Sequence, residues 1–164
     1  MYRSVFAASN FIRIFNASID DERAFPVYKK VAALGLITLF HVGCDLGFLD
    51  TPGASPRAMA KALQYFDGAP VVAAHLGGCA CWHEAREWMA GTQAYLDTSC
   101  SCGHVPLPEA KRIIDKHGTD RLLFGSDIPW SDAGNEMAFL RTLGLSDVQM
   151  QDVLGNNAQK LLGI

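Results

Sequence analysis

The chain has 164 residues, of which 49% are hydrophobic and 19% are charged, so it holds enough apolar material for one well-filled core. The formal net charge of −3 provides no basic field for nucleic acid, and no run of about 18 apolar residues could cross a bilayer. We therefore expect a single domain over residues 1–164 that binds neither nucleic acid nor membrane. The apolar stretch at the amino end is too short and broken for a secretory signal, and the odd count of five cysteines favours free thiols in a reducing, cytoplasmic setting.

Strand and helix patterns alternate along the first half of the chain. Residues 12–15 are a short strand candidate. Apolar residues at helical spacing predict a helix over 24–34, which Gly35 ends where a left-handed cap is common. The apolar run 36–41 then has the length of a buried parallel strand. After a long loop, Ser55 followed by proline indicates the start of the next helix.

The second half of the chain repeats the same unit. Apolar runs at 71–75, 94–98 and 122–127 predict three further strands, each followed by turn residues and a helical pattern, and a last helix starts near Ser146. About five units result, whereas a full (β/α)8 barrel has eight in roughly 250 residues. The repeat predicts an α/β fold with a parallel sheet, either open or part of a barrel. Five strands cannot close an eight-stranded barrel, so the first and last strands should be edges.

Three of the apolar runs end on a side chain that can bind a metal, namely His41, His75 and Asp127. The carboxyl ends of parallel strands converge on one face, so we expect these side chains to lie within about 10 Å of one another. Neutral imidazole is a common zinc ligand, and a carboxylate can ligate a metal or take a proton from its water. The alternatives are histidines that tie down loops, and Asp127 as a helix N-cap. Asp132 fits that cap better, because Pro129 follows Asp127 closely.

Further polar residues lie near the strand ends. Asp45 lies on the same rim as His41 and could bind substrate, although an Asx-turn fits equally well. Trp130 is a second candidate for substrate binding. Asp97 ends the fourth strand and could support the metal ligands from behind. His117 lies in a helical pattern, and we expect no special role for it.

The cysteines include two Cys-x-Cys pairs, Cys79 with Cys81 and Cys100 with Cys102, and both pairs follow strand ends. Neighbouring units could bring the four thiolates together around zinc. The usual Cys-x-x-Cys spacing of a zinc knuckle is missing, and small buried thiols are the simpler interpretation. No Gly-x-Ser-x-Gly elbow is present, so the sequence offers no well-placed alternative nucleophile.

Three motifs of the chain resemble those of a known family: Phe40-His41-x-Gly43, Ala74-His75-Leu76-Gly77-Gly78 and Leu123-Phe124-Gly125-Ser126-Asp127-x-Pro129-Trp130. Taken in this order, they resemble the amidohydrolase-related metal-dependent hydrolases, the group allied to aminocarboxymuconate-semialdehyde decarboxylase and γ-resorcylate decarboxylase. The helix start at 55–57 and the closing segment 155–162 are also similar to that group. The resemblance covers the chain from about residue 12 to its end.

The family fold is a metal-binding (β/α)8 barrel, and the resemblance implies a role for each matching residue. His41 corresponds to the metal-ligand histidine after strand five, and His75 to the histidine after strand six that often serves as acid or base. Asp127 corresponds to the strand-eight aspartate, a metal ligand and general base, and Arg13 would lie on strand four. The implied cofactor is a divalent metal, zinc or manganese, and the implied partner is a small-molecule substrate.

The chain departs from the family in one respect: it contains no His-x-His pair, which supplies two metal ligands on the family's first strand. We therefore expect a partial (β/α)8 barrel of about five strand–helix units. Three functions stay open. They are a metal-dependent hydrolase, a non-oxidative decarboxylase of a small aromatic or unsaturated acid on the same site, and a truncated, non-catalytic product. Open sheet edges and uncovered apolar surface also predict a homo-oligomer.

Overall fold

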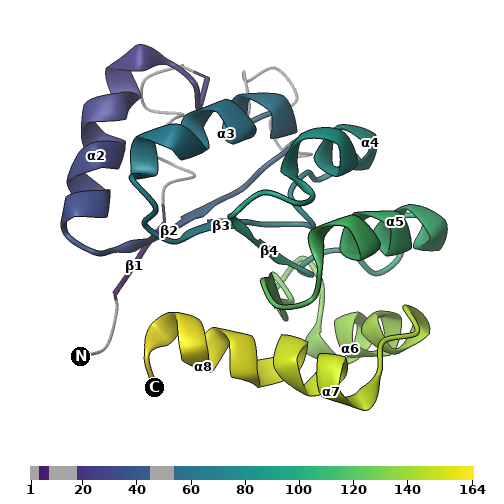
Figure 1. Ribbon diagram of the computed structural model, residues 1–164. Helices are drawn as coiled ribbons and strands as arrows, with labels where there is room; N and C mark the ends of the chain where they lie inside the picture. Colours follow the sequence, from purple (N-terminus) through teal and green to yellow (C-terminus); the bar gives the residue numbers. More distant parts are fainter. Residues whose placement is uncertain (1–3, 8–17, 45–53) are drawn as a thin grey trace.

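The structure, a computed structural model, describes residues 4–7, 18–44 and 54–164 (Figure 1). Its strands form one parallel sheet, in which each strand pairs with the next one along the chain. In both chain order and spatial order they are β1 (Val5–Ala7), β2 (Ile37–Phe40), β3 (Val71–Ala73), β4 (Tyr95–Asp97) and β5 (Leu122–Leu123). Within the described residues β1 and β5 each have one neighbour, so the described sheet is open at both ends.

Helical segments connect and follow the strands, as the alternating sequence pattern predicts. In chain order they are the 3-10 turn η1 (Glu22–Ala24), α2 (Phe25–Ala33), α3 (Pro56–Ala62), the 3-10 turn η2 (Leu63–Phe66), α4 (Trp82–Glu84), the π-helical turn η3 (Ala85–Met89), α5 (Leu107–His117), α6 (Ala133–Thr142), α7 (Asp147–Gln151), the π-helical turn η4 (Asp152–Asn156) and α8 (Asn157–Leu162). In the parts of the chain that the structure describes, no helix is long and apolar enough to cross a membrane.

Several helices begin or end at capping residues that the sequence analysis identified. Gly35 follows α2 with a φ of 66°, the left-handed conformation that glycine adopts without strain. The side chain of Ser55 accepts a hydrogen bond from the first turn of α3, and Ser146 forms a capping box at the start of α7. Asp132, rather than Asp127, is the N-cap of α6. This leaves the Asp127 carboxylate out of the helix and available to the rim of the sheet.

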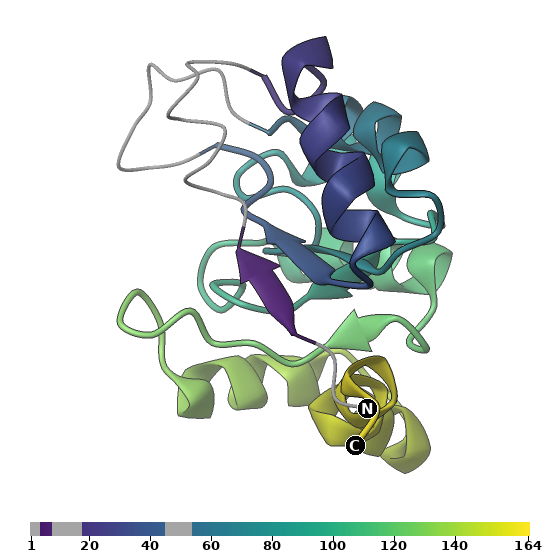
Figure 2. The same cartoon turned by 90° about the vertical axis from the view of Figure 1, so that its left-hand side faces the viewer.

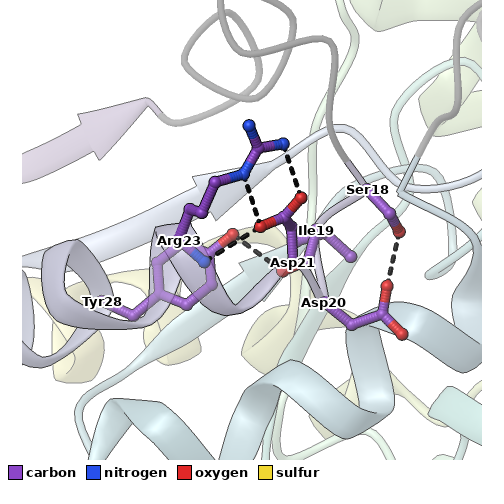
Figure 3. A network of polar contacts seen from close by, with 6 residues as sticks. All are labelled: Ser18, Ile19, Asp20, Asp21, Arg23 and Tyr28. Carbon is purple, nitrogen blue, oxygen red and sulfur yellow. Dashed lines mark hydrogen bonds and ion pairs between the residues drawn. The ribbon is translucent and has the colours of Figure 1, made fainter.

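The start of α2 is held by a polar network (Figure 3). The backbone N–H and the guanidinium of Arg23 donate to the Asp21 carboxylate at 2.9, 2.9 and 2.7 Å, and these hydrogen bonds lower the pKa of Asp21 to about 2. The hydroxyl of Tyr28 donates to the carbonyl of Ile19 at 2.9 Å. Because Tyr28 is a core residue, this bond ties the segment before the helix to the core.

The connecting helices cover one face of the sheet. Figures 1 and 2 show α2 and α3 on one side of the strands and α6, α7 and α8 on the other. Phe40 of β2 and Leu96 of β4 belong to the larger buried cluster, together with Tyr28 and Phe66 from the first side. The Tyr28 ring stacks on Phe66 at a centroid distance of 4.7 Å and meets Phe40 edge-on at 5.8 Å. Aromatic packing therefore fixes β2, the strand that leads to His41.

The opposite face of the sheet has a smaller apolar cluster. Ile37, Val72 and Leu123 lie there, because successive side chains of a strand point to opposite faces. In a closed barrel the face opposite the connecting helices is the interior, which strand side chains fill. In this structure Leu161 of α8 packs on that face instead. The sheet is thus a partial barrel whose inner face is covered by its last helix.

The first described strand is one that the sequence analysis did not predict. The strand candidate at 12–15, with Arg13, lies outside the described residues. The strand that pairs with β2 is β1, in which Val5 lies opposite Ile37. Val5 is 54% exposed, as an edge strand permits. A strand of three residues with such exposure needs no long apolar run, so periodicity alone could not identify it.

Candidate functional site

The candidate site lies at the carboxyl ends of the strands. His41 follows β2 directly, His75 comes two residues after β3, and Asp127 comes four residues after β5. All the strand pairs are parallel, so these three residues leave the sheet at the same edge. The structure therefore contains the carboxyl-terminal edge of a parallel sheet at which the sequence analysis expected the three candidate residues.

The two histidines are in contact. Nε2 of His75 lies 2.9 Å from Nδ1 of His41, and the ring centroids are 4.7 Å apart. His75 is 6% exposed and His41 is partly buried. The structure thus brings together the two imidazoles that the sequence placed at equivalent strand ends.

A buried serine and a buried aspartate orient His75. The hydroxyl of Ser99 donates to Oδ1 of Asp97 at 2.5 Å, so its oxygen can only accept from Nδ1 of His75, which lies 3.0 Å away. The carbonyl of Ser99, also an acceptor, lies 3.1 Å from the same nitrogen. Oδ1 of Asp97 further accepts the backbone N–H groups of His75 and Ser99 at 3.0 Å each. We therefore place a proton on Nδ1 of His75 and a lone pair on its Nε2.

The outer nitrogen of His41 is fixed in the same way. Its Nε2 lies 3.2 Å from the carbonyl of Cys44, which can only accept a hydrogen bond. In the neutral tautomer that donates from Nε2 to this carbonyl, Nδ1 of His41 holds a lone pair. The facing nitrogens lie at a hydrogen-bond distance of 2.9 Å, so a proton between the rings accounts for the contact, and a bound divalent ion would take the place of that proton. The donor set of this histidine pair fits a divalent metal ion.

Asp127 lies near the thiols of the rim. Burial, followed by the negative charges of Asp127 and Glu136, raises the pKa of Cys100, and Asp127 also contributes to the raised pKa of Cys79. Within the described residues, however, no group of three His, Cys, Asp or Glu side chains is close enough to hold a metal ion. The structure pairs the two histidines without gathering Asp127 into one ligand cluster with them.

Left-handed backbone marks this edge of the sheet. His75, Cys100 and Asp127 have φ values of 61°, 51° and 61°, although none of them is glycine. Such conformations cost about 1–3 kcal/mol each and are typical of active sites, where the surrounding structure enforces them. The strain occurs at the three strand ends that carry candidate side chains or their neighbours, which supports a functional rim.

Glu136 is a residue of the rim that the sequence analysis missed. It is fully buried in α6, and its carboxylate accepts the backbone N–H groups of Ser101 and Cys102 at 3.2 and 3.0 Å. The hydroxyl of Ser131 donates to its other oxygen at 2.6 Å. Glu136 thereby joins the loop after β4 to the loop that follows Asp127. A lone glutamate in an amphipathic helix gives no sequence signal for such a role.

Asp45 and Trp130 are the two residues that the sequence analysis proposed for substrate binding. Asp45 lies outside the described residues. The side chain of Trp130 is 78% exposed, while its backbone N–H donates to the carbonyl of Asp127 at 2.8 Å. Trp130 therefore belongs to the turn after Asp127, and its indole packs little against the described protein.

The cysteines do not form the four-thiolate site that their spacing allows. All five are free, and the described residues contain no metal-binding group of three. Cys81 has its close sulfur contact with Cys44, at an Sγ–Sγ distance of 3.2 Å. Cys79 is buried, and burial raises its pKa to about 11. The interpretation as small buried thiols holds for Cys79.

His117 has a structural role that the sequence analysis did not expect. It is 4% exposed, and its Nδ1 accepts the backbone N–H of Gly91 at 3.2 Å. Burial, and then the charge of Arg121, lowers its pKa. His117 lies seven residues after Ala110 on the buried face of α5, so helical periodicity contained the signal.

The fold and its polar rim define a partial β/α barrel with paired histidines at the carboxyl ends of its strands. The chain matches the profile of the amidohydrolase family over residues 16–164, and the protein belongs to that family. No functionally curated protein matches it. Similar solved structures confirm the fold class and include hydrolase-family and decarboxylase proteins.

Three of these structures illustrate the relation. A dihydroxybenzoic acid decarboxylase from Polaromonas with bound manganese is 16% identical, covers 90% of this chain and 55% of its own, and has a TM-score of 0.62. An amidohydrolase 2 from Bifidobacterium longum is 20% identical, with coverages of 89% and 57% and a TM-score of 0.62. An uncharacterised TIM-barrel protein from Bordetella bronchiseptica is 17% identical, with coverages of 98% and 66% and a TM-score of 0.69. This chain therefore spans between 55% and 66% of the length of these three structures.

Proposed function

We propose that the protein acts as a metal-dependent hydrolase of a small organic substrate. His41, Asp127 and Nε2 of His75 would hold a divalent ion, and Asp127 would also move protons. The observation that carries the proposal is the histidine pair, whose facing nitrogens lie 2.9 Å apart while the outer nitrogens are held by acceptors. Such outer hydrogen bonds orient histidine ligands in metal sites.

The ion would be zinc or manganese. When bound, it would lower the pKa of a water molecule and polarise the substrate. The manganese in the Polaromonas decarboxylase supports a divalent metal for this family. Asp127 would accept the proton that the attacking water loses. Ser99 occupies Nδ1 of His75, so Nε2 is the nitrogen of this ring that would bind the ion.

Non-oxidative decarboxylation of a small aromatic acid is the second candidate. The similarity to a dihydroxybenzoic acid decarboxylase favours it, since the same rim would serve either reaction. The two activities differ in their products: a decarboxylase releases carbon dioxide from a hydroxybenzoic acid, whereas a hydrolase consumes water at an ester, amide or lactone bond. Incubating the metal-loaded protein with both substrate classes separates them.

A non-catalytic product is the third candidate. The absence of a His-x-His pair from the sequence favours it, because the chain then lacks two family ligands. The described residues also contain no cluster of three ligands. Under this proposal the protein would bind zinc no better than a variant without the histidine pair.

Metal content tests the proposed function. The purified chain is dialysed against zinc or manganese, and bound metal is measured by mass spectrometry. We expect about one ion per chain, and His41→Ala should lose it. The control is His104→Ala, because His104 is exposed on a loop. A wild-type protein without bound metal, or equal loss in the control, would contradict the metal-dependent activities and favour the non-catalytic product.

A further inference from the structure

A second feature of the rim is the contact between Cys44 and Cys81. Cys44 lies in the loop after β2 and Cys81 precedes α4, so 37 residues separate them along the chain. Their Sγ atoms are 3.2 Å apart, and both thiols are free. Cys44 is exposed, and Cys81 is partly buried. Two thiols at this distance need only a small side-chain movement to reach the S–S bond length of about 2.05 Å.

Backbone hydrogen bonds hold the two loops together at this point. The N–H of Cys44 donates to the carbonyl of Cys79 at 2.8 Å, and the N–H of Cys79 donates to the carbonyl of Val42 at 2.7 Å. Gly43 has a φ of 100° and lies so close to the Cys79 backbone that a Cβ there would collide with it. The backbones of the two loops are therefore held together, so the two sulfurs can return to contact after either side chain rotates.

We propose that Cys44 and Cys81 form a reversible intramolecular disulfide, with a low-molecular-weight disulfide of the glutathione class as oxidant. The thiolate of Cys44 attacks one sulfur of the oxidant, whose S–S bond breaks and releases one thiolate. Cys81 then loses its proton to solvent and attacks the Cys44 sulfur, which releases the second thiolate. Two protein thiols are oxidised, one disulfide is reduced to two thiols, and the two protons end on the released thiols.

The environment of each sulfur fixes the order of these steps. Cys44 is exposed, so the oxidant can reach it first. Burial, together with the contact to Cys44, raises the pKa of Cys81 to about 11, so Cys81 is a poor first nucleophile. Cys81 nevertheless lies next to Cys44, so it can attack the mixed disulfide between Cys44 and the oxidant once that has formed. Cys79 is buried with a pKa raised to about 11 and is not the resolving thiol.

The disulfide would close a long loop across the rim. It would link the segments after β2 and β3, which contain His41 and His75. Closing a loop of this length restricts the unfolded chain, so the oxidised form should have a melting temperature at least about 5 °C above the reduced form. The reaction itself requires no metal, and its test is independent of the proposed function.

The experiment uses the full chain, reduced and then incubated with glutathione disulfide. We expect two of the five thiols to disappear and the mass to fall by about 2 Da, the mass of two hydrogen atoms. Peptide mapping should find Cys44 joined to Cys81, and dithiothreitol should restore both thiols. A stable glutathione adduct on Cys44, a disulfide between other cysteines, or no loss of thiols would each overturn the proposal.

Matched variants sharpen the test. Cys44→Ser and Cys81→Ser should each abolish the mass loss, whereas Cys102→Ser should retain it, because Cys102 is partly buried elsewhere on the rim. The wild-type peptide map decides the outcome even where a variant folds poorly. Retention of the disulfide in Cys81→Ser would overturn the assignment of the pair.

Discussion

Replacing Ser99 with alanine removes the hydroxyl that connects Asp97 to His75. The change deletes a 2.5 Å hydrogen bond to a carboxylate and one of the two acceptors of Nδ1 of His75. A hydrogen bond to a charged group contributes about 1.5–3 kcal/mol, so the free energy of unfolding should fall by roughly 2 kcal/mol. Outer partners of metal-binding histidines typically account for about 10- to 100-fold in metal affinity. We expect zinc binding to weaken by that factor.

The assay is a zinc titration with a competing chelator, combined with urea unfolding of the metal-free protein. The matched control is Ser101→Ala in the same loop. Ser101 is 1% exposed, and its hydroxyl has no hydrogen-bond partner among the described residues, so its loss should lower neither the zinc affinity nor the free energy of unfolding. Wild-type zinc affinity in Ser99→Ala, or an equal loss in Ser101→Ala, would refute the reasoning.

Four further predictions concern Asp127, Glu136, His117 and the edges of the sheet. Asp127→Asn should lower kcat at least about 100-fold in any metal-dependent turnover, because it removes a positioned proton acceptor; steady-state kinetics with and without a chelator measure this. Glu136→Gln should destabilise the chain by about 2–4 kcal/mol in urea unfolding, since an amide replaces a buried carboxylate that accepts hydrogen bonds from Ser101, Cys102 and Ser131. The lowered pKa of buried His117 means that the unfolded chain binds more protons, so stability should fall as pH drops below about 6.5, and His117→Ala should flatten that dependence. The open edges β1 and β5 should promote self-association, and a monomer in light scattering at high concentration would contradict this.

The strands after the first could be predicted because each is a short apolar run before a turn. The run 122–127 contains β5, but the strand is only Leu122–Leu123, since the N–H of Phe124 donates to the carbonyl of Val153 in η4 at 2.9 Å. A sequence pattern cannot anticipate that a distant helical turn takes over the hydrogen bond. The general architecture was therefore predictable, whereas strand lengths depended on tertiary contacts.

The histidine pair was predictable for a related reason. Parallel strands bring equivalent end positions together, so His41 and His75 could be paired from their places in the repeat. The roles of Ser99 and Glu136 could not be inferred, because their partners depend on loop conformations after β4 and β5. Cys-x-Cys spacing pointed to Cys79 and Cys81 as a pair, but the loop after β2 brings Cys44 against Cys81 instead.

In the proposed site, the facing nitrogens of His41 and His75 hold lone pairs that bind a divalent ion. Proton–nitrogen correlation spectra of the five histidines report the protonated nitrogen of each ring directly. We predict that His75 carries its proton on Nδ1 and His41 on Nε2 in the zinc-bound protein, and that one equivalent of zinc shifts Nε2 of His75 and Nδ1 of His41. A proton found on Nε2 of His75 with zinc present, or zinc-induced shifts confined to other histidines, would contradict the account.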